Sequence, residues 1–86
     1  MFVLPKQINI DEAIAFIQTN KSQFSLKVSK LCENHCDMSI NVVNIDVYPK
    51  GKTDPFDKID AYKIQCNGSK QAENYLSKLK ETLYGF

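Results

Sequence analysis

Arginine is absent from this sequence. All eleven basic side chains are lysines, and ten acidic side chains leave a formal net charge of only +1. Without a guanidinium group the chain has no bidentate clamp for phosphate or carboxylate, so any anion site must use lysine, hydroxyl or backbone N–H groups. A charge so near neutrality gives no bulk electrostatic signal for nucleic acid or for a membrane surface. We therefore expect neither of them as a partner.

Long apolar runs are missing as well. No segment approaches the roughly 20 apolar residues that a membrane-spanning helix needs, and the opening residues MFVLPKQ lack the apolar region of a signal peptide. We expect a cytoplasmic protein. Its three cysteines, Cys32, Cys36 and Cys66, are then expected to be free thiols, because an odd number fits a disulfide framework poorly.

What the chain does have is an ordinary globular composition. Its 86 residues are 43% hydrophobic and 24% charged, which is typical of a folded domain and argues against disorder. This length supports one domain, residues 1–86, with a single modest core. We expect a monomer or a weak dimer.

Two segments have the periodicity of amphipathic helices. The first is predicted over 9–19, where Asn9 is a favoured N-cap and Glu12 completes a capping box. The second follows Ser69, its predicted cap. The apolar stripes of the two helices are Ala13, Ile14 and Ile17 in the first, and Ala72, Tyr75 or Leu76, Leu79 and Leu83 in the second.

Strands are predicted between and around these helices. A short one is expected over 1–4, and alternation of apolar and polar residues predicts others over 24–32 and 59–66. In the last, we expect the core face to hold Asp60, Tyr62, Ile64 and Cys66. The segment SINVVNI, residues 39–45, fits a strand by β-branching and a helical turn by spacing, and the local pattern does not decide. This order predicts an α+β fold in which helices cover one face of a small antiparallel sheet.

Three stretches of the chain resemble the histidine-containing phosphocarrier protein (HPr) family of the bacterial sugar phosphotransferase system. They are INIDEAIAFIQTNKSQFSLKVS, SINVVNI and AYKIQCNGSKQAENYLSKLKETL. The resemblance implies an open-faced β-sandwich, with four antiparallel strands and three helices on one side. It also implies that SINVVNI is the short second helix of the family. Two departures are a shorter first strand containing Pro5 and a longer loop over 46–58.

The resemblance also places the family's active position in this chain. Family members carry a phosphoryl group on a histidine at the N-cap of the first helix, followed by an arginine. Here these places fall on Asn9 and Asp11. An amide has no nucleophilic nitrogen, and Asp11 with Glu12 brings negative charge that repels an incoming phosphate. We therefore expect Asn9 to be a structural cap, and the chain to be neither an enzyme nor a carrier.

Ser39 corresponds to the family's regulatory serine. It is a phosphorylation candidate, although capping a helix would explain it equally well, and Asp37 weakens the benefit of a phosphate there. The resemblance implies that Ile40, Val42 and Val43 form an apolar docking surface beside it. We take Ile40, Val42 and Asn9 as the candidates for contact with a partner protein.

The single histidine lies between two cysteines in CENHC. Cys32, His35 and Cys36 have ligand chemistry, but C-x-x-x-C with one histidine lacks a second pair and a fourth ligand. We expect an ordinary turn here, with no metal and no cofactor.

Together these features predict an HPr-like protein without phosphocarrier activity that acts as a regulatory or protein-binding module. Phosphorylation of Ser39 is the candidate means of control. Two alternatives stay open. One is a genuine phosphotransferase component with a displaced active residue, for which only His35 is available. The other is an unrelated α/β-plait interaction domain.

Overall fold

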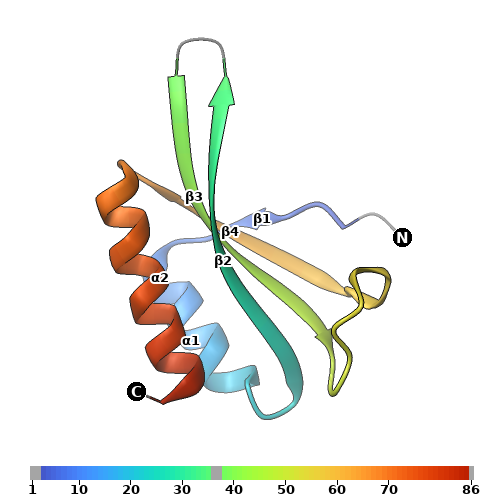
Figure 1. The fold of residues 1–86 in the computed structure, drawn as a ribbon. Coiled ribbons are helices and arrows are strands. Elements are labelled where there is room, and N and C mark those ends of the chain that lie inside the picture. The colour runs from blue at the N-terminus through green and yellow to red at the C-terminus, as the bar shows by residue number, and fades with distance from the viewer. Residues whose placement is uncertain (1–2, 36–37, 86) are drawn as a thin grey trace.

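A sheet and a layer of helices make up the fold (Figure 1). The computed structural model describes residues 3–35 and 38–85. Its elements are β1 (Lys6–Gln7), α1 (Ile10–Asn20), β2 (Phe24–His35), β3 (Met38–Pro49), the 3-10 helix η1 (Pro55–Asp57), β4 (Asp60–Cys66) and α2 (Ser69–Tyr84). The predicted α+β class and the four-stranded sheet are confirmed.

The sheet is mixed, which corrects the prediction of a wholly antiparallel one. Its strand order is β1-β4-β3-β2. The strands β2, β3 and β4 pair antiparallel, as strands joined by hairpins must. In contrast, β1 pairs parallel with β4, with Lys6 opposite Tyr62. No hairpin joins these two strands, because the whole chain from α1 to η1 separates them, so their relative direction is set by packing.

The first strand begins later than predicted. Residues 3–5 form no strand, and β1 starts at Lys6, directly after Pro5. Proline has no N–H to donate to a ladder, so pairing begins only beyond it. The first two residues of the predicted strand lie outside the described residues.

The segment 39–45 lies inside β3 and forms no helix. The short second helix that the family resemblance implies is therefore replaced by strand. Both neighbours of β3 contribute: Val43, for example, is opposite Lys30 of β2 and Ile64 of β4. This two-sided pairing decides between strand and helical turn, since β-branched side chains fit a pleated sheet.

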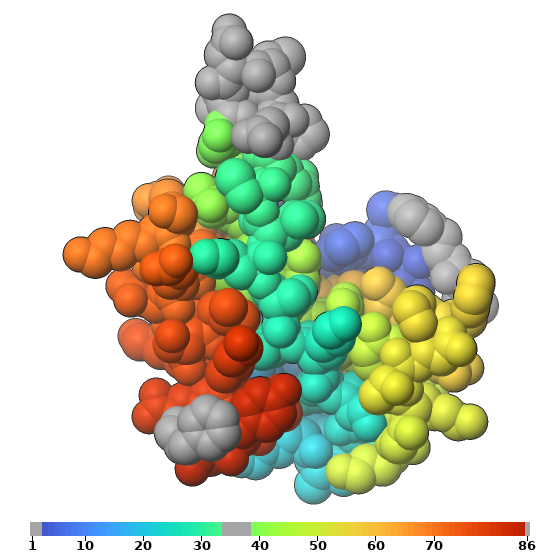
Figure 2. All heavy atoms as spheres, in the orientation of Figure 1, coloured from blue at the N-terminus to red at the C-terminus, as the bar shows by residue number. Residues whose placement is uncertain are grey.

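The β2–β3 hairpin extends beyond the rest of the sheet. Pairing of β3 with β4 reaches only to Asn41 and Cys66, whereas β2 and β3 remain paired out to His35 and Met38. The resulting two-stranded projection, residues 33–35 and 38–40, is called the arm below. Figure 1 shows it rising clear of the two layers, and Figure 2 shows the lower part of β2 facing the viewer between α2 and the loop after β3.

The two helices begin near their predicted positions. Asn9 caps α1 with the predicted capping box, which is confirmed. At α2, however, the N-cap is Gly68 and Ser69 is the first helical residue, with no side-chain capping bond. Gly68 has φ of +112°, a conformation that glycine adopts without strain. The sharp exit from β4 therefore places the cap one residue earlier than predicted.

Both helices cover the same face of the sheet. The largest fully buried side chains come from every layer: Ile17 of α1, Val43 and Ile45 of β3, Ile64 of β4 and Leu79 of α2. As predicted, Ile64 and Cys66 face this core and Tyr62 packs against it. Neither α1 nor α2 has the length and hydrophobicity needed to cross a bilayer.

Candidate functional site

The head of α1 is occupied by a reciprocal cap. The Oδ1 atom of Asn9 accepts a hydrogen bond from the backbone N–H of Glu12 at 2.8 Å. The backbone N–H of Asn9 donates to Oε1 of Glu12 at 3.1 Å. Just before it, the N–H of Ile8 donates to the carbonyl of Lys63 at 3.0 Å, which ties the helix entry to β4. Two of the N–H groups at this terminus are thus used internally, and Asp11 adds a further negative charge in the first turn.

Ser39 is positioned by a strand rather than by a helix. It is opposite Asn34 near the end of the arm and is exposed. The prediction that Ser39 caps a short helix is therefore wrong. A phosphate on this residue would lie on an extended β-hairpin, without the helix N-terminus that favours such a group.

Ile40 and Val42 lie on the same face of β3, because side chains two residues apart point the same way. Leu31 is directly opposite Val42 on β2. Val43, one residue on, points to the helix side and is fully buried there. We call Leu31, Ile40 and Val42 the open-face patch, since they lie on the face that the helices leave uncovered.

The three residues of the open-face patch differ in exposure. Leu31 is 46% exposed and Ile40 is half-buried. Val42, one of the residues predicted to contact a partner, is only 4% exposed, so it supplies little contact area. The sequence did not identify Leu31 as part of this patch. Its place beside Val42 depends on the pairing of β2 with β3, which the local pattern does not reveal.

The three residues with ligand chemistry, Cys32, His35 and Cys36, are only partly described. Cys32 is exposed on β2, only the backbone of His35 is described, and Cys36 lies outside the described residues. Among the side chains that the structure describes, no three from His, Cys, Asp or Glu are grouped as metal ligands. Cys66 is a separate, buried thiol, and burial raises its pKa.

Tyr62 and Asp60 form a polar pair at the start of β4. The Tyr62 hydroxyl donates to Oδ2 of Asp60 at 2.9 Å, and Nζ of Lys6 lies 3.9 Å from the same carboxylate oxygen. The Tyr62 ring also packs on Phe16, with centroids 4.7 Å apart. Burial, and after it the bond to Asp60, raises the pKa of the Tyr62 hydroxyl. The pair anchors α1 and β1 on β4.

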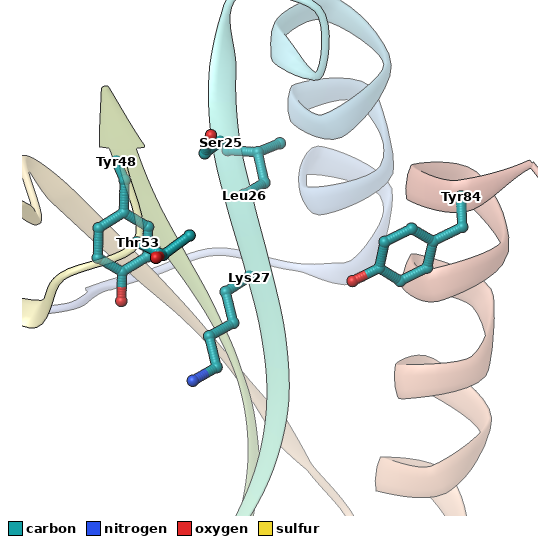
Figure 3. Close-up of a pocket in the computed structure, with 6 residues that line it drawn as sticks. All are labelled: Ser25, Leu26, Lys27, Tyr48, Thr53 and Tyr84. Atoms are coloured by element: carbon teal, nitrogen blue, oxygen red, sulfur yellow. The ribbon is translucent and has the colours of Figure 1, made fainter. Parts of the chain in front are cut away.

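A hollow of about 320 Å³ lies at the outer edge of β2. We call it the edge groove. Its lining residues are Ser25, Leu26, Lys27, Tyr48, Thr53 and Tyr84. Figure 3 shows Tyr48 and Thr53 on one side of β2 and Tyr84, from the end of α2, on the other. Sequence reasoning missed it because its residues come from four separate parts of the chain.

The loop after β3 is held against this groove. The N–H of Gly51 donates to Oγ of Ser25 at 2.9 Å, and the N–H of Lys52 donates to the carbonyl of Pro49 at 2.9 Å. These bonds fix the position of Thr53. The acid that follows it, Asp54, accepts the N–H of Phe56 at 2.9 Å as the cap of η1.

Lys27 is the one charged side chain among the residues that line the edge groove. Lys27 is opposite Asp46 in the β2–β3 register, but the Asp46 carboxylate lies 3.5 Å from Nζ of Lys58 instead. Among the described residues Lys27 has no acidic partner, and Lys50 and Lys52 are exposed in the adjoining loop. The charges around the groove therefore favour an acidic ligand.

Comparisons with protein-family models, curated proteins and solved structures found no match to this chain.

Proposed function

We propose that this chain is a protein-binding module without phosphocarrier activity, of the regulatory HPr-like kind that its sequence suggests. The observation that carries the proposal is the reciprocal cap between Asn9 and Glu12. At the position where a carrier would hold its histidine, the side chain is an amide engaged in closing the helix. The adjacent Asp11 opposes a phosphate electrostatically.

The arm and the open-face patch support the binding half of the proposal. Leu31 and Ile40 present apolar surface on the sheet face away from the helices, where the neighbouring positions Ser29, Asn44 and Lys63 are polar. An apolar patch rimmed by polar residues is typical of a contact surface. The arm stands clear of the body, so a partner reaches it without displacing α1 or α2. We place the module in the cytoplasm, as a monomer or weak dimer.

A phosphotransfer assay tests the absence of carrier activity. The protein is incubated with phosphoenolpyruvate and the general phosphotransferase enzyme, with an authentic HPr as the positive control. We expect no acid-labile phosphate on this chain. If phosphate appears, the His35→Ala variant shows whether the histidine carries it, and the proposal is overturned in favour of a carrier with a displaced residue.

Site-specific photo-crosslinking tests the binding half. A photoreactive residue is introduced at Leu31, or at the exposed Asn74 of α2 as a control, and crosslinked in cells of the source organism. We expect discrete protein adducts from position 31 that are absent from position 74 and are lost when Ile40→Asp is added. Equal adducts from both positions would overturn the open-face patch as the contact surface.

Regulation through Ser39 is the remaining part of the proposal. A phosphate on this exposed arm residue adds negative charge to the face of the arm opposite Ile40, and we expect it to change the affinity of a partner that contacts the arm. An HPr-type kinase is expected to modify Ser39 in the same tube as an authentic HPr, and Ser39→Ala to abolish the modification. Modification of the authentic protein alone would remove the regulatory part and leave the binding part standing.

A further inference from the structure

The outer edge of β2 is a strand edge with which no other described strand pairs. In the order β1-β4-β3-β2, β2 is the last strand. Alternate residues of an antiparallel edge strand point their N–H and C=O groups away from the sheet. Over 24–31, the backbone of β2 forms no hydrogen bond with the backbone of any described residue outside its ladder with β3, and the Gly51 N–H reaches only the side chain of Ser25. Such an edge is a template for a further strand.

The edge groove supplies side-chain contacts at the same place. It is lined by three consecutive residues of β2, namely Ser25, Leu26 and Lys27. Consecutive residues of a strand point to opposite faces, so the groove spans both sides of the edge. On the open face Lys27 lies with Tyr48 and Thr53, and on the helix face Leu26 lies with Tyr84.

We propose that the edge groove binds an extended acidic peptide segment of a partner protein, which adds to β2 as a fifth strand. Main-chain hydrogen bonds to the edge provide affinity, and alternate side chains of the peptide enter the two sides of the groove. A carboxylate on the open face meets Lys27, and an apolar side chain on the other face meets Leu26 and the ring of Tyr84.

The charges beside the groove favour an acidic peptide over a neutral or basic one. Lys27 has no acidic partner among the described residues, and Lys50 and Lys52 add positive charge beside the groove. Asp46 is paired with Lys58, and the one further acid beside the groove, Asp54, which caps η1, leaves these lysines in excess. The groove is also separate from the open-face patch, because Lys27 and Leu31 are four residues apart, or roughly 14 Å along a strand.

The probe is a ten-residue peptide of alternating valine and glutamate with both ends blocked, titrated by calorimetry into the full chain. A peptide with lysine in place of glutamate is the charge control. We expect the acidic peptide to bind and the basic one not to bind. Lys27→Gln is expected to lower the affinity by up to about fivefold, the size of one exposed ion pair. The matched change Lys70→Gln, at the far end of α2 from Tyr84, should leave the affinity unchanged.

Two N-methylated peptides test for strand addition itself. One carries methyl groups on every valine nitrogen and the other on every glutamate nitrogen. Only one of these sets faces β2, so one peptide should lose binding and the other should keep it. Loss in both, or in neither, would overturn the proposal. Sedimentation at the same concentrations adds a last criterion: a dimer of this chain that competes with the acidic peptide would assign the edge to a second copy instead.

Discussion

At the scale of single residues, Ile40 and Val43 are only three positions apart but lie on opposite faces of the sheet. Val43 is fully buried between β3 and the helices, whereas Ile40 is half-buried on the open face. Local hydrophobicity is the same for both side chains. What differs is the face of the strand on which each side chain lies. Val43 therefore stabilises the core, and Ile40 belongs to the proposed contact surface.

This difference predicts opposite effects of the same substitution. Val43→Asp buries an unpaired charge and should cost several kcal/mol, enough to unfold much of a domain whose total stability is about 5–15 kcal/mol. Ile40→Asp should cost about 1 kcal/mol or less while reducing partner crosslinking. Thermal denaturation of both variants checks this. Similar melting temperatures for the two would contradict the assigned strand register.

Tyr62 predicts a pH dependence of stability. Its pKa is raised in the folded protein by burial and by the bond to Asp60, so the folded state disfavours the ionised phenol. The contribution of the neutral Tyr62 hydroxyl to the free energy of unfolding is fully present below the pKa of an unfolded tyrosine, about 10. It is lost as the pH rises through the higher pKa of Tyr62 in the folded protein.

The measurement is urea unfolding of the wild type and Tyr62→Phe from pH 8 to 11. The variant loses a hydrogen bond and should be less stable by about 0.5–1.5 kcal/mol near pH 8, but the gap should narrow as the pH rises. Tyr75→Phe, at another half-buried tyrosine that packs against the core, serves as the control. A gap that stays constant up to pH 11 would show that Tyr62 does not ionise more easily on unfolding.

At the scale of elements, α1 and α2 were predictable because their signals are local. The cap Asn9 and the apolar positions of α1 lie within a few residues of one another, and helical hydrogen bonds connect only near neighbours. The strand β3 was not predictable in this way. Its segment 39–45 becomes a strand only because β2 and β4 lie on either side.

The cap of α1 gives an element-scale prediction. Asn9→Ala removes the acceptor for the Glu12 N–H and should destabilise the protein by about 1 kcal/mol. Asn9→Asp keeps an acceptor at the same place and should be close to the wild type. Chemical denaturation of both variants checks the prediction, and equal losses would show that the hydrogen bond seen at 2.8 Å is not what stabilises the helix head.

At the scale of the whole molecule, one shared core joins the helices to the sheet. Leu79 of α2 is fully buried in it, together with Ile17 of α1 and Ile45 of β3. Leu76, on the same helix, is only half-buried at the margin. The sequence pattern placed Leu79 in the apolar stripe and left the choice between Tyr75 and Leu76 open, because the depth of each side chain depends on how α2 packs across β2 and β3.

Truncating these two leucines measures that difference. Leu79→Ala should cost about 2–5 kcal/mol, since a deep cavity is left behind. Leu76→Ala should cost clearly less, because solvent already reaches the site. Calorimetric unfolding of both variants provides the comparison, and a larger loss at Leu76 would mean that the rotation of α2 about its axis differs from that described here.

The sequence by itself determined the α+β class, the positions of both helices, the capping box at Asn9 and the alternation of β4. Each of these depends on residues that are close in the chain. Only the tertiary structure decided that β1 runs parallel to β4, that Ser39 lies in a strand, and that Lys27, Thr53 and Tyr84 line one groove. These features arise from contacts between distant segments, and such contacts depend on burial and pairing partners that no local pattern contains.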